Sequence, residues 1–294
     1  MTSLLLLALS LPCVYWTQGV ETRAKLDAAG ITRLCGEADL ASREALPTPG
    51  ITSRPGLASP TRSPWIVSSG WRFARHAGRK YLYDVPAGKA ALAAAEAFAY
   101  DADAVLKIDP ADAGTLGEML TFLESLLAVD LPPVADLAVV DDGSAIAGEV
   151  MSLLARRNLL FEAVQASSPR FRINVAVGSR EYPREEAADP SAFALKIRRQ
   201  LTDEQRSLRV YGSEVVIGRL TGDAGRIRLH LINYGGREIE GLRIRLRGAY
   251  RAGEALVFSA GRLPLQDYSV ADGATEFSLP RLATYAVIDL EAAR

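Results

Sequence analysis

The sequence has few of the residues that build disulfide frameworks and metal sites. Its 294 residues include only two cysteines and two histidines. That scarcity excludes a disulfide-rich scaffold and nearly every zinc site, because both need several such side chains. The sequence also contains no apolar run of about 18 residues, the length that an ordinary membrane-spanning helix requires. We therefore expect no bound metal and no membrane span.

The sequence also lacks an excess of positive or negative charge. Lysine and arginine total 34, aspartate and glutamate total 35, and the net charge is −1. This balance argues against a generally basic nucleic-acid-binding protein and against an acidic disordered tail. The sequence has no glycine-rich phosphate loop, no HExxH motif and no Gly-x-Ser-x-Gly motif. We therefore expect no cofactor and neither protease nor esterase activity.

The amino-terminal residues leave the cellular compartment open between two alternatives. Residues 4–11 form a short apolar stretch of the length of a signal-peptide core. No basic residue precedes it, and no small-x-small cleavage site follows it. The chain is expected either to be exported to the periplasm or outside the cell through this weak signal, or to stay in the cytoplasm with these residues as a buried first strand.

Cys13 and Cys35 are expected to be two free thiols. Residues 14–16 and 31–34 are predicted to form neighbouring parallel strands joined by a helix over about residues 20–29. Cys13 would then start one strand and Cys35 would end the next. At a rise of about 3.3 Å per residue, this arrangement separates the cysteines by more than the ~7 Å that a disulfide tolerates.

Hydrophobic periodicity divides the chain into three predicted regions. Residues 1–131 alternate strands and helices, with a proline-rich extended loop at 47–64. Residues 132–206 continue the alternation, which predicts a small three-layer α/β unit. In residues 207–294 the apolar period changes to two, and seven short strands predict an antiparallel β-sandwich. The expected fold class is therefore α/β followed by all-β.

Three segments resemble parts of multidomain glycoside hydrolases of the β-galactosidase type. Residues 225–248, GRIRLHLINYGGREIEGLRIRLRG, are similar to a strand and hairpin of their carboxy-terminal sandwich. Residues 135–164 resemble their glutamine-amidotransferase-like middle domain, and residues 90–108 resemble a late helix–strand turn of a (β/α)8 barrel. The resemblance implies that the first region is a partial barrel or another layered α/β arrangement.

Departures from that family bear on activity. A complete barrel needs about 200 residues or more, whereas only residues 1–131 precede the middle region. These enzymes usually place the acid/base glutamate directly after an asparagine, but Asn158, Asn174 and Asn233 are followed by other residues. The lack of a Cys–His constellation also implies that the middle domain is catalytically silent. The resemblance therefore implies ancestry more readily than hydrolytic activity.

Carboxylates on one helix and at strand ends are the candidates for catalysis. Glycoside hydrolysis needs two carboxyl groups, one of which is held protonated. Glu96 flanks the apolar stripe of a helix predicted over about residues 87–102, and Asp109 ends the strand predicted at 104–108. We take Glu96 and Asp109 as the catalytic candidates. The structural alternatives are an ion pair for Glu96 and a capping role for Asp109.

Aromatic residues close to the proline-rich loop are candidates for sugar contacts. Trp65, Trp71 and Tyr83 offer flat rings to the C–H faces of a sugar, and Asp141 at the end of a predicted strand joins them as a binding candidate. The alternatives are aromatic rings that fill the core edge and a turn role for Asp141. Trp71 alternates with Phe73 in a strand-like segment, which favours burial of that pair.

Arginines alternate with apolar residues on two strands of the predicted sandwich. Arg243, Arg245 and Arg247 lie on one strand, and Arg226, Arg228 and His230 lie on another. This alternation predicts the solvent-facing side of a sheet. A nucleic-acid platform would interleave aromatic residues with the basic ones, so we expect no nucleic-acid partner. An anionic polysaccharide stays open as a ligand of these faces.

The patterns together favour a carbohydrate-binding protein, a reduced relative of glycoside hydrolases with weak or no hydrolysis. Two alternatives stay open. One is an active glycoside hydrolase that uses a carboxylate pair, and the other is a structural or interaction protein of the cell envelope. Carbohydrate is the expected partner, and homo-oligomerisation is left open.

Overall fold

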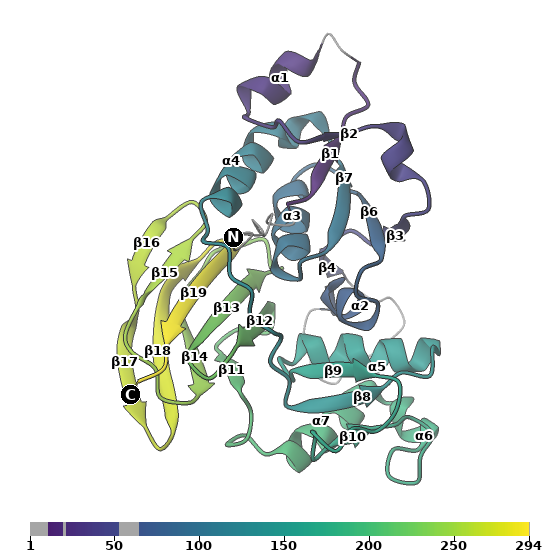
Figure 1. Cartoon of the computed structure of the whole chain (residues 1–294), viewed down its shortest axis with the longest axis vertical. Helices are drawn as coiled ribbons and strands as arrows, with labels where there is room; N and C mark the ends of the chain where they lie inside the picture. Colours follow the sequence, from purple (N-terminus) through teal and green to yellow (C-terminus); the bar gives the residue numbers. More distant parts are fainter. Residues whose placement is uncertain (1–10, 20–21, 53–64, 294) are drawn as a thin grey trace, which may run out of the picture. The chain divides into compact units, whose positions relative to one another are not determined.

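The computed structural model describes residues 11–19, 22–52 and 65–293 (Figure 1). Residues 4–10 of the apolar stretch and residues 53–64 of the proline-rich segment lie outside these ranges. The export signal and the extended loop expected there therefore stay predictions.

The described residues form two units. The first consists of the described parts of Met1–Pro49 and Ala77–Leu131, and the second of those of Gly50–His76 and Pro132–Arg294. The described residues of this segment, 50–52 and 65–76, therefore pack with the second unit, although in the sequence they interrupt the first.

The first unit is built on an open parallel sheet. Its five strands lie in the order β2-β1-β7-β6-β3, and every neighbouring pair is parallel. Strands β2 and β3 are the two edges, so the described residues form no closed barrel, and the predicted α/β class of this region is confirmed. The elements are β1 (Cys13–Tyr15), α1 (Arg23–Ala28), β2 (Leu34–Cys35), η2 (Glu37–Leu40), β3 (Glu44–Leu46), β6 (Lys80–Asp84), α3 (Ala90–Ala99), β7 (Asp103–Lys107), η3 (Pro110–Asp112) and α4 (Ala113–Glu124).

The two cysteines form a disulfide bond, so the prediction of two free thiols is wrong. The predicted strands β1 and β2 do form and are parallel, but they have only three and two residues. Cys35 lies opposite Tyr15, which places Cys13 only two residues out of register. The two Cα atoms are 5.7 Å apart, within the range that a disulfide spans.

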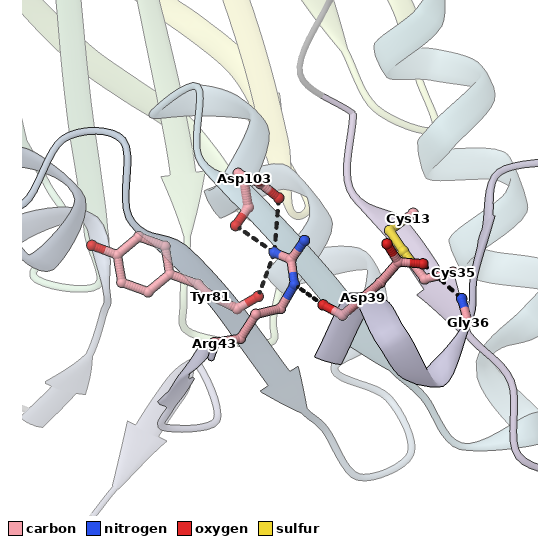
Figure 2. The surroundings of a disulfide bond; sticks show 7 residues. All are labelled: Cys13, Cys35, Gly36, Asp39, Arg43, Tyr81 and Asp103. Carbon is pink, nitrogen blue, oxygen red and sulfur yellow. Dashed lines mark hydrogen bonds and ion pairs between the residues drawn. A yellow bond between two sulfur atoms is a disulfide. The ribbon is translucent and has the colours of Figure 1, made fainter. Parts of the chain in front are cut away.

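A buried arginine fixes the backbone beside the disulfide. Figure 2 shows the guanidinium of Arg43 donating to the carbonyl oxygens of Asp39 and Tyr81 and to Asp103. The bond to the Asp103 carboxylate is 2.8 Å long, and only 6% of the Arg43 side chain is exposed. Arg43 therefore ties the segment after β2 to strands β6 and β7, which it reaches across 38 and 60 residues of sequence.

The second unit begins with a parallel three-stranded sheet and its helices. The strands lie in the order β10-β8-β9, and Leu137, Val139, Val150, Leu154 and Phe193 are among the residues that fill its core. The elements are β4 (Gly50–Thr52), β5 (Trp65–Val67), α2 (Gly70–Arg75), β8 (Leu137–Val140), α5 (Ala145–Arg156), β9 (Phe161–Val164), β10 (Asn174–Val175), α6 (Arg184–Ala187) and α7 (Pro190–Leu201).

The segment that contains Trp71 and Phe73 is a helix, so the strand-like interpretation of it is wrong. Helix α2 runs over Gly70–Arg75 and buries Phe73, while Trp71 stays partly exposed. Apolar residues two positions apart occur in both strands and helices, and a window of five residues cannot separate the two periods.

The carboxy-terminal part of the second unit is a β-sandwich. A four-stranded sheet, β11-β14-β18-β17, faces a five-stranded sheet, β12-β13-β19-β15-β16, and all strand pairs are antiparallel. Apolar side chains of both sheets form one core. The strands are β11 (Leu208–Tyr211), β12 (Val216–Gly222), β13 (Arg226–Asn233), β14 (Ile239–Arg247), β15 (Glu254–Val257), β16 (Gly261–Pro264), β17 (Gln266–Ala271), β18 (Ala274–Leu282) and β19 (Tyr285–Glu291).

Three polar residues join the sandwich to the α/β layers of the second unit. Asn158 lies in the left-handed region (φ 52°) after α5, donates to the Val216 carbonyl at 3.0 Å and accepts from the Gly218 amide at 2.7 Å. Asp136 accepts from the amide and hydroxyl of Ser207 at 3.0 and 2.6 Å. Arg206 donates to the carbonyl of Asn158. These bonds explain why residues from Pro132 onward form a single unit.

The prediction that Arg228 and His230 face solvent is wrong. Arg228 and His230 on β13 are 3% and 6% exposed. Each polar group has a partner on β19, which makes its burial tolerable. Arg228 binds Asp289 through two bonds of 2.7 and 2.6 Å, and Nδ1 of His230 lies 2.6 Å from the Tyr285 hydroxyl.

Protonation of His230 is expected to make stability depend on pH. Burial, and next the nearby Arg219 and Arg228, lower the pKa of His230 well below its ordinary value of about 6.5. Below pH 6.5, His230 is therefore protonated in the unfolded chain but stays neutral in the folded chain. The free energy of unfolding should fall by about 1 kcal/mol between pH 6.5 and pH 5.5.

Urea unfolding of the wild type and of His230→Gln at a series of pH values checks this expectation. The variant lacks the titrating ring, so its stability should change less over that interval. Equal slopes for the two proteins would show that His230 does not titrate in this way.

Candidate functional site

Glu96 and Tyr83 meet in the interior of the first unit. Glu96 on α3 and Tyr83 on β6 are both fully buried. The Tyr83 hydroxyl donates to Oε2 of Glu96 at 2.5 Å. This bond supplies a partner that a buried carboxyl group requires. Tyr83 therefore positions Glu96 and does not present its ring on the surface.

Asp109 lies at a turn after β7. Its Oδ1 accepts from the amide of Ala111 at 2.8 Å, which caps the short helix η3. The neighbouring Asp112 is the buried carboxylate here, and it accepts the amides of Gly88, Lys89 and Ala90 at the start of α3 at 2.6, 3.1 and 3.0 Å. Glu96 and Asp109 each have a partner of their own, and the observed bond of Asp109 is that of a capping residue.

Asp141 is held at the end of β8 by a buried arginine. Arg75 from α2 donates through Nε to Oδ2 at 2.9 Å and through Nη2 to Oδ1 at 2.7 Å. Only 9% of the Arg75 side chain and 5% of the Asp141 side chain are exposed. Nη2 of Arg75 also donates to the Ser144 carbonyl, and the Gly143 amide donates to Asp141.

The guanidinium determines the charge of Asp141. Burial alone would raise the pKa of this carboxyl group, but the hydrogen bonds from Arg75 and Gly143 outweigh burial and hold the pKa below its ordinary value. Asp141 is therefore ionised at neutral pH. A general acid needs the opposite shift, so the arrangement suits a structural or binding role.

Trp71 and Arg75 lie against α5 at Gly148, where a β-carbon would require them to shift. A β-carbon at Gly148 would lie 2.8 Å from Nη1 of Arg75 and 3.0 Å from the indole of Trp71. The guanidinium of Arg72 also lies near the indole, 4.2 Å from the ring centroid. Gly148 thus allows α2 to approach α5 closely enough for Arg75 to reach Asp141.

Trp65 stacks with an arginine from the last turn of α5. The guanidinium carbon of Arg156 lies 3.4 Å from the centroid of the Trp65 ring, within the range of a cation–π contact. Trp65 lies on β5 and is partly exposed. Both tryptophan candidates therefore lie next to guanidinium groups in the second unit, whereas Tyr83 and Glu96 are paired in the first.

The described residues contain no group of three or more histidine, cysteine, aspartate and glutamate side chains that could hold a metal ion. No helix in that part of the chain is long and apolar enough to cross a membrane.

Similar proteins are found by comparison of structures and not by comparison of sequences. No protein-family model matches the chain, and no curated protein matches it in sequence. The structure of α-L-fucosidase isoenzyme 2 from Paenibacillus thiaminolyticus is similar with a TM-score of 0.55 and 10% sequence identity, over 75% of this chain and 62% of the fucosidase. A rhamnosidase from Novosphingobium sp. PP1Y gives a TM-score of 0.47 at 9% identity, over 73% of this chain and 31% of that one.

A β-galactosidase from Bacillus circulans sp. alkalophilus gives a TM-score of 0.44 at 10% identity, over 96% of this chain and 60% of that one. The chain thus spans 62%, 31% and 60% of these three enzymes. Through the likeness to the fucosidase, the expected resemblance to glycoside hydrolases is confirmed at the level of fold. The order of the sheets confirms the expected class, α/β followed by antiparallel β-sheets.

Proposed function

We propose that the chain binds carbohydrate and hydrolyses it weakly or not at all. The observation that carries the proposal is the likeness of its fold to the fucosidase, a protein whose name states that it acts on a sugar. Fold alone does not define chemistry, so the proposal also depends on the state of the candidate side chains.

The carboxylates support binding more than hydrolysis. Hydrolysis needs two carboxyl groups on opposite sides of a glycosidic bond, and one must stay protonated. The bidentate bond from Arg75 keeps Asp141 ionised, and Asp109 caps a turn. Glu96 lies fully buried against Tyr83. Each candidate carboxylate therefore has a structural function that would have to be broken for catalysis.

The tryptophans are the proposed sugar contacts. Trp65 and Trp71 are both partly exposed, and a stacked guanidinium beside each ring restrains its orientation. A restrained flat ring loses little conformational freedom when a sugar packs on it. The middle part of the second unit, resembling a glutamine-amidotransferase-like domain, serves as the scaffold that carries these rings and is catalytically silent.

The disulfide supports export of the chain. Disulfides persist in oxidising surroundings such as the periplasm or the extracellular space, and they are rare in the cytosol. Cys13 and Cys35 are the two cysteines of the sequence, and they pair with each other. We therefore favour export through the apolar amino-terminal stretch over retention in the cytoplasm.

A glycan array probed with the purified full chain tests the proposal. The wild type should bind a subset of glycans, and Trp65→Ala should weaken that binding about tenfold, the effect of truncating a central aromatic contact. Trp16→Ala is the matched control. Trp16 lies in the first unit and donates to Thr22 at 2.9 Å, so its loss should leave binding unchanged.

Hydrolysis of the bound glycans is measured with the same proteins and with Glu96→Gln. Binding with little release of sugar is the expected result. Efficient hydrolysis that Glu96→Gln abolishes would replace the proposal with an active hydrolase. Absence of binding to every glycan would remove the carbohydrate proposal and leave the envelope-protein alternative.

A further inference from the structure

One face of the sheet β11-β14-β18-β17 carries more arginines than carboxylates. In the strand register, Arg209 lies opposite Arg245, Tyr211 opposite Arg243, and Arg245 opposite Glu276. Residues opposite each other in antiparallel strands share a face. The alternate residues of β11 and β14 point into the sandwich core. The arginine row therefore lies on the outward face.

We call this surface the arginine face and define it by six residues: Arg209, Tyr211, Arg243, Arg245, Arg247 and Glu276. Arg247 belongs to it because it follows Arg243 and Arg245 at two-residue spacing on β14. These six residues comprise four arginines, one tyrosine and one glutamate. Glu276 forms ion pairs with two of these arginines, Arg243 and Arg245.

The charges around the face reduce the excess but do not cancel it. At one rim, Asp203 and Glu204 offset Arg198 and Arg206, and Asp203 also lies 3.4 Å from Arg209. On the edge strand β17, the charge of Asp267 acts on Arg243. An excess of two positive charges remains over these residues, in a chain whose net charge is −1.

An arginine at the rim of the face binds a carboxylate through two hydrogen bonds. Arg198 donates through Nε and Nη2 to the two carboxylate oxygens of Asp203 at 3.0 and 2.8 Å. This pair of hydrogen bonds holds the pKa of Asp203 well below its usual range. Arg243 is mostly exposed, with 62% of its side chain open to solvent. Its guanidinium can therefore turn to a carboxylate of an incoming ligand.

An aromatic ring lies among the guanidinium groups. Tyr211 is partly exposed, and the guanidinium of Arg209 lies 4.7 Å from its ring centroid. A sugar ring packs its C–H face on such a ring, while its carboxylate reaches a neighbouring arginine. A nucleic acid would instead need a positive surface that follows many phosphates, with several aromatic rings for stacking.

From this arrangement we propose that the arginine face binds an acidic polysaccharide whose sugars carry carboxylates. The inference rests on the proposed carbohydrate function and gives it a second binding surface, separate from Trp65 and Trp71. The ligand lies across β11 and β14, with uronic-acid carboxylates on Arg243, Arg247 and Arg209 and one sugar ring on Tyr211.

Binding of the full chain to polygalacturonate, measured by calorimetry, tests the proposal. The same polymer with its carboxyl groups converted to methyl esters is the uncharged counterpart, and it should bind at least tenfold more weakly, since each charge-assisted bond to a carboxylate is lost. Arg243→Gln should weaken polygalacturonate binding about tenfold, and Tyr211→Ala should weaken it to a similar extent.

Arg262→Gln is the matched control. Arg262 lies on β16 of the other sheet, is 71% exposed and pairs with Glu254 at 3.6 Å, so the change removes the same charge away from the face. It should leave binding unchanged. Equal loss with Arg262→Gln would show general charge attraction and overturn the proposal, as would equal binding of the esterified polymer or tighter binding of single-stranded DNA.

The outcomes separate this inference from the proposed function. If neutral glycans bind and polygalacturonate does not, the arginine face is not a glycan site while the carbohydrate function stands. If neither kind of glycan binds, the proposed function fails together with the inference.

Discussion

Replacement of Arg75 by alanine is expected to lower the free energy of unfolding of the second unit by about 3–5 kcal/mol. Arg75 and Asp141 are both buried, and the guanidinium provides two hydrogen bonds of 2.9 and 2.7 Å to the carboxylate. Without Arg75, Asp141 becomes a buried charge with its main partner removed. Urea unfolding followed by fluorescence checks the loss, and a Trp16→Phe background limits the signal to Trp65 and Trp71 of this unit.

Two further variants separate the buried charge from a general effect of losing an arginine. Arg75→Met combined with Asp141→Leu removes both charges and should recover part of the lost stability. Arg170→Ala removes a pair with Glu162 of the same unit whose side chains are 70% and 35% exposed, and it should cost less than about 1 kcal/mol. A loss no larger for Arg75→Ala than for Arg170→Ala would show that the buried pair does not stabilise the fold.

Removal of the disulfide is expected to lower the free energy of unfolding of the first unit by about 3 kcal/mol. The bond joins residues 22 positions apart, and opening a loop of that size gives the unfolded chain roughly this much additional conformational freedom. The change is Cys13→Ser with Cys35→Ser, and Trp16, three residues from Cys13, reports unfolding in a background with Trp65 and Trp71 replaced by phenylalanine.

Reduction provides the control for this second expectation. Dithiothreitol should destabilise the wild type to the level of the double serine variant and should leave that variant unchanged. If oxidised and reduced wild type unfold at the same urea concentration, the disulfide contributes nothing to the stability of the unit.

The sandwich was the part of the fold most open to prediction. Seven of its strands show a period of two, because one side of each strand faces the common core. Strands β16 and β17 were not predicted, because GRLP and QDYSVA are largely exposed edge segments with no such alternation. Burial of Arg228 and His230 was not predicted for a related reason. The alternation of apolar and polar residues shows which side of a strand faces the core, but it does not show that polar side chains on the other side have buried partners.

The candidate site was less predictable, because its contacts join residues far apart in the sequence. Helical spacing placed Glu96 beside an apolar stripe, but its partner Tyr83 lies on a strand and was assigned to a sugar platform instead. Arg75 reaches Asp141 across 66 residues, and no local pattern links them. Gly148 carries no signal in the sequence, since its function is to leave space for Trp71 and Arg75. The prediction that the two cysteines are free thiols was wrong because it depended on the lengths of the two strands, which hydrophobic periodicity determines poorly.

Recovery of a bound glycan distinguishes binding without hydrolysis from both catalysis and the absence of binding. The purified chain is incubated with the glycan that it binds most tightly, and the glycan is then released and its mass determined, with an active glycoside hydrolase run in parallel. We expect the protein to retain the glycan and to release it with its mass unchanged, while the parallel enzyme has shortened it. A glycan that is never retained would show that the chain does not bind carbohydrate, and recovery of shorter products would show that it is a hydrolase.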